Sequence, residues 1–183
     1  MNHIHKLAKL GNNVAVGHFT VIEENVQVGA NVTIGNNVTI YSGSILGAGV
    51  TIFDNAVIGR PPLPSKSSTA KVDPDLHPVV IGEGTSVGAG AVLYMGSTFG
   101  KDVMIGDQAS VREKCTIGER VVIGRGVAVE NQVTIGSFTK IQTNAYITAY
   151  TTLEERVFIA PTVTTTNDNF MGRTEERCKY IKG

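Results

Sequence analysis

The sequence predicts an all-β fold in which short parallel strands wind into about eight triangular coils. The composition is the first reason: the 183 residues include 39 Val and Ile but 7 Leu, with 19 Thr, 21 Gly and no Trp. Such a mixture favours strands and tight turns over helices. The second reason is a repeat, because a large apolar residue recurs every six residues at 24 positions, from Ile4 to Ile58 and again from Ile81 to Ile159.

Each six-residue unit is expected to form one short strand and one corner. Two residues before the repeated apolar position, 23 of the 24 units carry Ala, Val, Thr, Ser or Cys. We expect both side chains to point inward, so that three units close one coil around a narrow apolar interior. Gly directly follows the apolar residue in 13 of the 24 units, and we expect it to supply the backbone torsions of the corners.

Positions that lie three units apart form three columns along the stack, and one column differs from the other two. In the column that begins with Ile4, only Ile58 is followed by Gly. The residues that follow the other seven apolar positions of this column are His5, Glu23, Tyr41, Tyr94, Arg112, Glu130 and Thr148. We therefore expect chemically active side chains to gather at this corner.

The repeat also divides the chain. Residues 1–160 are predicted to form the β-helix, residues 60–80 to form a loop extruded from it, and residues 161–183 to form a C-terminal excursion and tail. A long loop in a regular chain is often functional, and Lys66, Lys71 and His77 are groups suited to a phosphate. A tolerated surface insertion would explain the same loop without a function.

Charge and targeting signals narrow the class of protein. The formal net charge is zero and 17% of the residues are charged, which argues against a nucleic-acid footprint, a polybasic membrane patch and disorder. No apolar run reaches the roughly 18 residues that span a bilayer, and the first residues lack the apolar core of a signal peptide. Two cysteines without metal-site spacing suit a reducing compartment, so we expect a cytoplasmic protein.

The repeated units resemble those of hexapeptide-repeat acyltransferases, over residues 4–160. That resemblance implies a left-handed parallel β-helix and an acyl donor carried by coenzyme A or by an acyl-carrier protein. Three segments, at residues 59–62, 106–113 and 165–169 before Arg173, resemble the branch that N-acylates nucleotide-linked amino sugars for glycans. This branch implies a homotrimer with active sites between chains, acyl-CoA as cosubstrate and no bound cofactor.

The resemblance also points to catalytic residues. In this branch a catalytic His often lies five residues before the Gly of an apolar–Gly pair, and here Glu113 and Asn131 take that place on successive coils. Glu113 is the candidate base and Asn131 the neighbour that orients the substrate or polarises the thioester. If Glu113 is not positioned for this, a water or the leaving thiolate takes the proton, and His77 is a rival base or a phosphate or sugar contact. A solvated corner, paired with Lys114 or with Arg112 of a neighbouring chain, is the plain alternative for Glu113.

Further site residues are predicted around these. The substrate-binding candidates are Asp107, Ser110, Arg112, Glu130, Gln142 and Asn144, and the CoA-binding candidates are Asn167, Asp168 and Arg173. Arg173 suits a bidentate phosphate contact. An amide ladder for Gln142 and Asn144, and a capping arm for the C-terminal residues, would explain them without a ligand.

The predicted function is therefore transfer of an acetyl or short acyl group from acyl-CoA to the amine of a dTDP- or UDP-linked amino sugar. The alternatives are O-acetylation of a sugar or small molecule, and a catalytically silent scaffold subunit. A trimeric zinc carbonic anhydrase is rejected, because three His must converge on the metal and the four His here avoid the central coils. An ice-binding face is rejected because the Thr residues are scattered, and no metal site is expected.

Overall fold

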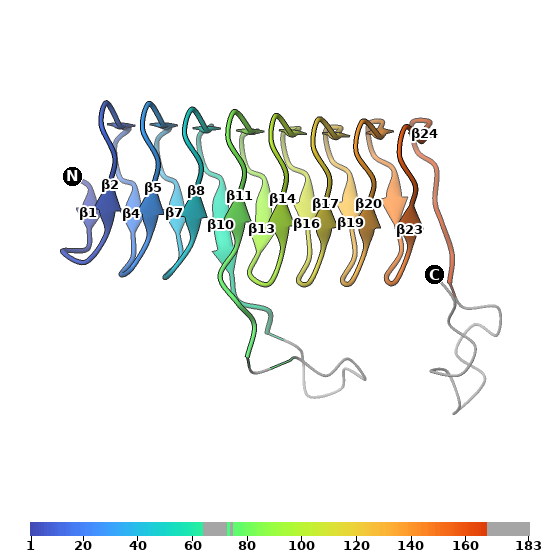
Figure 1. Cartoon of the computed structure of the whole chain (residues 1–183), viewed down its shortest axis with the longest axis horizontal. Helices are drawn as coiled ribbons and strands as arrows, with labels where there is room; N and C mark the ends of the chain where they lie inside the picture. Colours follow the sequence, from blue (N-terminus) through green and yellow to red (C-terminus); the bar gives the residue numbers. More distant parts are fainter. Residues whose placement is uncertain (64–72, 74, 168–183) are drawn as a thin grey trace.

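The computed structural model describes residues 1–63, 73 and 75–167, and these residues wind into a stack of triangular coils (Figure 1). The coils contain three sheets, each of eight parallel strands, and most strands are two residues long. Within the described residues there is no helix that could cross a membrane. The predicted all-β, left-handed β-helix of about eight coils is confirmed.

The three sheets take every third strand of the chain. The first sheet comprises β1 (His3–Ile4), β4 (Val21–Ile22), β7 (Thr39–Ile40), β10 (Val57–Arg60), β13 (Val92–Tyr94), β16 (Ser110–Val111), β19 (Ala128–Val129) and β22 (Tyr146–Ile147). The second sheet comprises β2 (Lys9–Leu10), β5 (Gln27–Val28), β8 (Ile45–Leu46), β11 (Val80–Ile81), β14 (Thr98–Phe99), β17 (Thr116–Ile117), β20 (Thr134–Ile135) and β23 (Thr152–Leu153). The third sheet comprises β3 (Ala15–Val16), β6 (Thr33–Ile34), β9 (Thr51–Ile52), β12 (Ser86–Val87), β15 (Met104–Ile105), β18 (Val122–Ile123), β21 (Lys140–Ile141) and β24 (Phe158–Ile159). We call the turns from the first sheet to the second corner 1, from the second to the third corner 2, and from the third back to the first corner 3.

The strands stack in the predicted register of three units per coil. Ile22 pairs with Ile40, and the register survives the long insertion, since Ile58 pairs with Leu93 on the next coil. It also continues beyond β24, because Thr164 forms an isolated parallel bridge with Tyr146 and the Thr165 amide donates to the Tyr146 carbonyl. The chain therefore keeps its register past Pro161, where we expected it to leave the stack, and residues 168–183 lie outside the described part.

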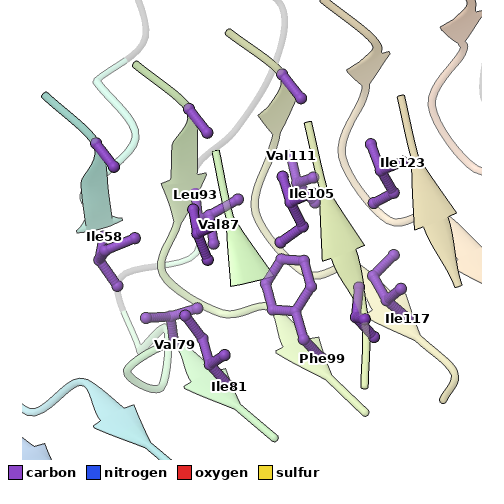
Figure 2. Packing of buried hydrophobic residues seen from close by; sticks show 14 of the residues in the cluster. Ile58, Val79, Ile81, Val87, Leu93, Phe99, Ile105, Val111, Ile117 and Ile123 are labelled. Atoms are coloured by element: carbon purple, nitrogen blue, oxygen red, sulfur yellow. The ribbon is translucent and has the colours of Figure 1, made fainter. Parts of the chain in front are cut away.

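The core is a single apolar column inside the coils (Figure 2). The repeated apolar residues and the small residues two positions earlier are both buried in the central coils, as in the pairs Ala91 with Leu93 and Val103 with Ile105. Phe99 is the largest fully buried side chain and replaces an aliphatic residue of the second sheet. One large and one small side chain per strand fill this interior, as the repeat predicted.

Polar residues inside the column link one coil to the next. The Thr85 hydroxyl donates to the Gly100 carbonyl at 3.2 Å and accepts from the Val103 amide at 3.2 Å. Ser97 repeats this arrangement with the Arg112 carbonyl and the Cys115 amide. Since each hydroxyl both donates and accepts, these residues are buried without a lost hydrogen bond.

Most glycines that directly follow the repeated apolar residue do not supply the left-handed corner torsion that we expected of them. The left-handed torsion of each corner lies two residues after the Gly, for example at Asn13 (φ 58°) and Asn31 (φ 58°). The Gly itself is required by the next coil, because a Cβ at Gly100 would lie 2.7 Å from the Glu119 nitrogen and one at Gly29 would lie 2.6 Å from the Ala48 nitrogen. The prediction that the Gly directly after the apolar residue supplies special torsions is therefore wrong except at Gly59 (φ 77°), because close backbone stacking is what excludes a side chain at the other positions. Glycine does supply the left-handed corner torsion at another position of the unit, three residues after the apolar one, at Gly43, Gly49, Gly84, Gly90, Gly96 and Gly126.

The extruded loop leaves and returns at corner 1, along the lower edge of the stack in Figure 1. Its two ends are held by the next coil, since the Met95 amide donates to the Arg60 carbonyl at 3.1 Å and the Gly96 amide to the His77 carbonyl at 2.7 Å. Lys114 on the following coil forms an ion pair with Asp73 at 2.7 Å. These contacts place the loop ends at corner 1, which also carries Tyr94, Arg112 and Glu130. Lys66 and Lys71 lie outside the described residues.

Candidate functional site

Corner 1 carries a stack of large polar and aromatic side chains over neighbouring coils. The guanidinium of Arg60 lies 5.4 Å from the centroid of the Tyr94 ring, and that of Arg112 lies 6.0 Å from the same ring. Both distances are within the range of a cation–π contact. The stacking of the coils places Tyr94, Arg112 and Glu130 in one line, so the side chains of successive coils meet.

Arg112 is the centre of this stack because it bonds two carboxylates. It donates to both oxygens of Glu113, from Nη2 to Oε1 at 2.9 Å and from Nε to Oε2 at 3.1 Å. A third bond runs from Nη1 to Oε2 of Glu130, on the next coil, at 3.2 Å. We call Arg112, Glu113 and Glu130 the corner 1 triad.

The triad is partly shielded from water and carries one net negative charge. The side chain of Glu113 is 10% exposed, that of Glu130 24% and that of Arg112 34%. Partial burial opposes the charge of Arg112, but the hydrogen bonds and charges of Glu113 and Glu130 outweigh it and raise the pKa of Arg112. The guanidinium therefore stays charged, and the two carboxylates share it.

Tyr146 extends this electrostatic environment to the next coil. Burial raises the pKa of the Tyr146 phenol, and the negative charge of Glu130 raises it further. The phenol thus stays protonated beside Glu130. Beneath the triad, the Cys115 thiol donates to the Glu130 carbonyl at 3.1 Å, and burial raises its pKa to about 11.

The predicted base, Glu113, lies in this triad rather than at a solvated corner. Its partner is Arg112 of its own chain, whereas Lys114 pairs with Asp73. The alternative that paired Glu113 with Lys114 is therefore wrong, whereas a pairing with Arg112 of a neighbouring chain stays a prediction. A base role for Glu113 stays a prediction, and the geometry gives this carboxylate a strong competing partner.

The other two predicted catalytic residues lie at the same corner. Asn131 is half-buried next to Glu130, and its carbonyl accepts from the Tyr150 amide at 3.1 Å. His77 is exposed where the loop returns to the stack, and its Nδ1 lies 2.7 Å from the Pro78 carbonyl oxygen. Their roles stay predictions, but the fold brings both to corner 1.

The predicted substrate residues divide between two edges of the coil. Arg112 and Glu130 belong to the corner 1 triad, and Ser110 is half-buried on β16 of the first sheet. Asp107 and Gln142 instead line a groove of about 410 Å³ on the third sheet and corner 3. The predicted site is therefore not one cluster within a single chain.

The groove on the third sheet, called here the corner 3 groove, has a mostly apolar lining. Its walls include Phe53, Met104, Val122 and Arg125, and the stacked glycines at 88, 106 and 124 also line it. Asp107 is already engaged, because its Oδ1 accepts from the Ala89 amide at 2.8 Å.

Asn144 has a structural role in the same region. It adopts the left-handed corner torsion (φ 58°), and a Cβ at Gly126 on the preceding coil would meet its side-chain oxygen. Asparagine is one of the residues that tolerate this torsion. This favours a corner residue over a ligand contact.

The C-terminal candidates are described only in part. Asn167 donates from Nδ2 to the Ala149 carbonyl at 2.8 Å, which ties the end of the described chain to corner 1. Asp168 and Arg173 lie outside the described residues. No cluster of three His, Cys, Asp or Glu residues suited to a metal occurs in the described ranges.

Sequence reasoning did not name Arg60, Tyr94 or Tyr146 as site residues. It placed Tyr94 one coil before Arg112, in the column where side chains were expected to gather, but gave it no role. Arg60 was not detectable in this way, since the loop shifts the register between Ile58 and Arg60. Tyr146 precedes the inward Ile147, so alternation alone places it on the outer face.

Comparisons with known proteins identify the repeat. The family model described as bacterial transferase hexapeptide (six repeats) matches residues 7–42 and 96–131. The resemblance to hexapeptide-repeat proteins is thereby confirmed. A search of curated proteins found no significant match.

Solved structures share the fold. The UDP-N-acetylglucosamine acyltransferase of Francisella novicida superposes with a TM-score of 0.83 and 24% identity over 91% of this chain and 62% of its own. The enzyme of that name from Bacteroides fragilis gives 0.75 and 23% over 91% and 66%. A mutant GDP-perosamine N-acetyltransferase of Caulobacter crescentus, in complex with CoA and GDP-perosamine, gives 0.53 and 21% over 67% and 52%. The chain thus spans less than two thirds of the length of the Francisella protein, and at these identities the likeness establishes the β-helix.

Proposed function

We propose that this hexapeptide-repeat protein is an acyltransferase that moves an acetyl or short acyl group from acyl-CoA to the amine of a nucleotide-linked sugar. The observation that carries the proposal is the corner 1 triad, a half-buried charged cluster beside the loop ends. The hexapeptide transferase match and the nucleotide-sugar acyltransferases of the same fold support it. Both proposed substrates are soluble cytoplasmic metabolites, which agrees with the expected location.

Acyl transfer from a thioester to an amine needs a deprotonated nucleophile, stabilisation of the developing oxyanion and a fixed geometry. Corner 1 offers carboxylates at Glu113 and Glu130, the amide of Asn131 and the imidazole of His77. Arg112 and the loop end at His77 are the groups suited to phosphate or sugar oxygens. This set can bind a nucleotide-linked amino sugar and accept a proton from it.

We further propose that the active unit is a homotrimer with sites between chains. In one chain the first sheet separates corner 1 from the corner 3 groove, so the two regions lie on different edges of the coil. A threefold assembly would place corner 1 of one copy against the groove of the next, and the apolar groove suits the pantetheine arm of CoA. The acceptor and the donor would then meet at the seam.

The direct test measures release of free thiol from acetyl-CoA with a panel of dTDP- and UDP-linked amino sugars. Each amino sugar is paired with the analogue that carries a hydroxyl in place of the amine. We expect turnover with at least one amino sugar and none with its hydroxyl partner. Turnover of the hydroxyl partners alone would favour O-acylation, and no turnover of any sugar by an intact assembly would favour the silent scaffold.

The shared site is tested by mixing inactive chains. Met104→Asp places a charge in the corner 3 groove, and Glu130→Gln removes a carboxylate from corner 1. Mixed assemblies of the two variants should regain part of the activity if one site draws on both chains, with sedimentation confirming the trimer. A matched control is Phe158→Asp, at the same strand position three strands further along the third sheet but outside the groove lining. No recovery in mixtures would contradict shared sites.

A further inference from the structure

The corner 1 triad shares one guanidinium unequally between its two carboxylates. Glu113 receives two N–H bonds from Arg112 in a paired arrangement, whereas Glu130 receives one bond at 3.2 Å. Paired guanidinium–carboxylate contacts are stronger and more rigid than single ones. The positive charge of Arg112 is therefore directed mainly at Glu113, and the net negative charge of the triad resides mainly on Glu130.

Glu130 is also the more exposed of the two carboxylates. The side chain of Glu113 is 10% exposed and that of Glu130 is 24% exposed. A carboxylate has about four acceptor positions, and Glu130 uses one of them for Arg112. Arg112 takes two of these positions on Glu113, so Glu130 is the more accessible carboxylate and has more acceptor positions left by Arg112.

The surroundings of Glu130 suit a cation. Tyr146 lies beside it on the following coil, and Arg112 on the preceding coil lies over the Tyr94 ring. A partly buried carboxylate without a full countercharge is destabilising, and a bound cation removes that penalty. The ligand that fits is an ammonium group, which is the protonated form of the proposed acceptor amine.

We infer that Glu130, rather than Glu113, is the carboxylate that binds the ammonium group of the acceptor and takes its proton, while Glu113 positions Arg112. This inference rests on the proposed function. Glu130 accepts one proton from the ammonium, and the free amine attacks the thioester carbonyl. The C–N bond forms, the C–S bond breaks, and the second nitrogen proton passes to the leaving thiolate to give the free thiol.

Within the described residues, four charged or titratable groups face Glu130. Arg112 contributes a positive charge and Glu113 a negative one. The Tyr146 phenol and the buried Cys115 thiol stay protonated near neutral pH and add no charge. Because only an ionised carboxylate can accept the proton of the ammonium, the rate should fall on the acid side of the pH profile, which we call the acid limb.

The experiment compares three glutamate variants under the same assay. Glu130→Gln should lower kcat/KM for the amino sugar by about 100-fold or more, raise KM and remove the acid limb of the pH profile. Glu113→Gln should lower the rate by less than about tenfold and keep the acid limb, since it disturbs only the position of Arg112. Glu23→Gln is the matched control, because Glu23 occupies the same corner position on the second coil and bonds Ser42 instead.

The outcomes separate this inference from the proposed function. If the unaltered protein turns over no sugar, the proposed function fails. If it is active but Glu130→Gln keeps the acid limb, or Glu113→Gln loses it, the assignment of Glu130 is overturned. Thermal unfolding of each variant shows that the fold is retained, and a Glu130→Asp variant that keeps the acid limb at a lower rate would support the carboxylate role.

Discussion

Corners 1 and 2 of the same coils are built from the same repeat, yet they join successive coils by different means. At corner 2 the position after the apolar residue is Gly on most coils, and backbone approaches backbone so closely that a Cβ at Gly100 would clash. At corner 1 the same position carries Tyr94, Arg112 and Glu130, whose side chains contact one another across the coils.

The ion pairs of the two corners differ in their exposure to water. The corner 2 pairs, Glu83 with Lys101 at 2.8 Å and Asp102 with Arg120 at 3.7 Å, are all more than half exposed. The corner 1 triad is largely shielded. Exposed pairs contribute little to stability, whereas a shielded cluster fixes its geometry. The repeat thus supplies the scaffold at every corner, and a shielded cluster of charged side chains forms at corner 1, where such residues take the place of Gly.

The largest expected effect is a loss of stability from a single methyl group at corner 2. Gly100→Ala should lower the free energy of unfolding by roughly 3 kcal/mol, because its Cβ would lie 2.7 Å from the Glu119 nitrogen. Glu23→Ala, at the equivalent place of corner 1, should cost less than about 1 kcal/mol. Urea unfolding followed by circular dichroism measures both, and equal losses would mean that the two corners do not differ in this way.

Removing Arg112 from corner 1 should lower the free energy of unfolding more than removing Arg120 from corner 2. Arg112→Ala leaves the buried Glu113 without its partner and should cost about 2 kcal/mol, a value reduced because Arg112 is partly solvated. Arg120→Ala removes an exposed pair and should change stability by about 0.5 kcal/mol or less. A double-mutant cycle of Arg112→Ala with Glu113→Ala should give a coupling of about 1 kcal/mol, and a coupling near zero would contradict the triad.

An alkaline loss of stability is expected from the thiol beneath corner 1. Burial raises the pKa of Cys115 from 9.0 to about 11, so the folded state keeps the neutral thiol where the unfolded state ionises. Stability from this group is complete below pH 9 and is lost as pH rises toward 11, by about 1.4 kcal/mol at pH 10. Unfolding between pH 8 and 10, in a Cys178→Ser background, measures the loss.

The control for the thiol is Cys115→Ala, which should remove this part of the alkaline dependence. The corresponding interior positions of corner 2 are Val103 and Val121, which carry no titratable group. A Cys115→Ala variant with an unchanged alkaline slope would show that another group causes it.

The smallest expected effect is a shift in one phenol. Burial raises the pKa of Tyr146 above 10.0 and the Glu130 charge raises it further, so Glu130→Gln should lower this pKa without returning it fully to its ordinary value. Spectrophotometric titration detects the change, and Tyr146→Phe identifies the signal among the five tyrosines. Glu119→Gln at corner 2 should leave the titration of Tyr146 unchanged, and an equal shift there would mean that the Glu130 effect is not local.

Much of the scaffold followed from spacing alone. The six-residue step predicted the 24 strands, the pairing of units one coil apart and the inward position of residues such as Leu93 and Ala91, since an interior this narrow admits few arrangements. The column in which only Ile58 is followed by Gly predicted which corner would carry large polar and aromatic side chains. The role of the Gly directly after the apolar residue was wrong at every position but Gly59, because the distance between stacked coils cannot be read from one coil's sequence.

The sequence predicted which candidate site residues share a corner, but it did not predict which of them bond to one another. Arg112, Glu113 and Glu130 were all named from the sequence, yet their partners were not, because side-chain pairing depends on distances and on competition among neighbours. Asp107 and Gln142 were assigned to the same intersubunit site, and within one chain they lie in the corner 3 groove, so that assignment stays a prediction that depends on the proposed trimer.

The sequence by itself determined the triangular coil, because apolar and small residues at a period of six must both be buried in a narrow interior, while the left-handed sense was implied by the resemblance to hexapeptide-repeat proteins. The tertiary structure decided how one positive charge is divided between two carboxylates at corner 1. The Nε and Nη2 edge of Arg112 is paired with Glu113, and the stacking of the coils leaves Glu130 with a single bond from Nη1. A repeat specifies which side chains are neighbours, and their geometry specifies which of them bond to one another.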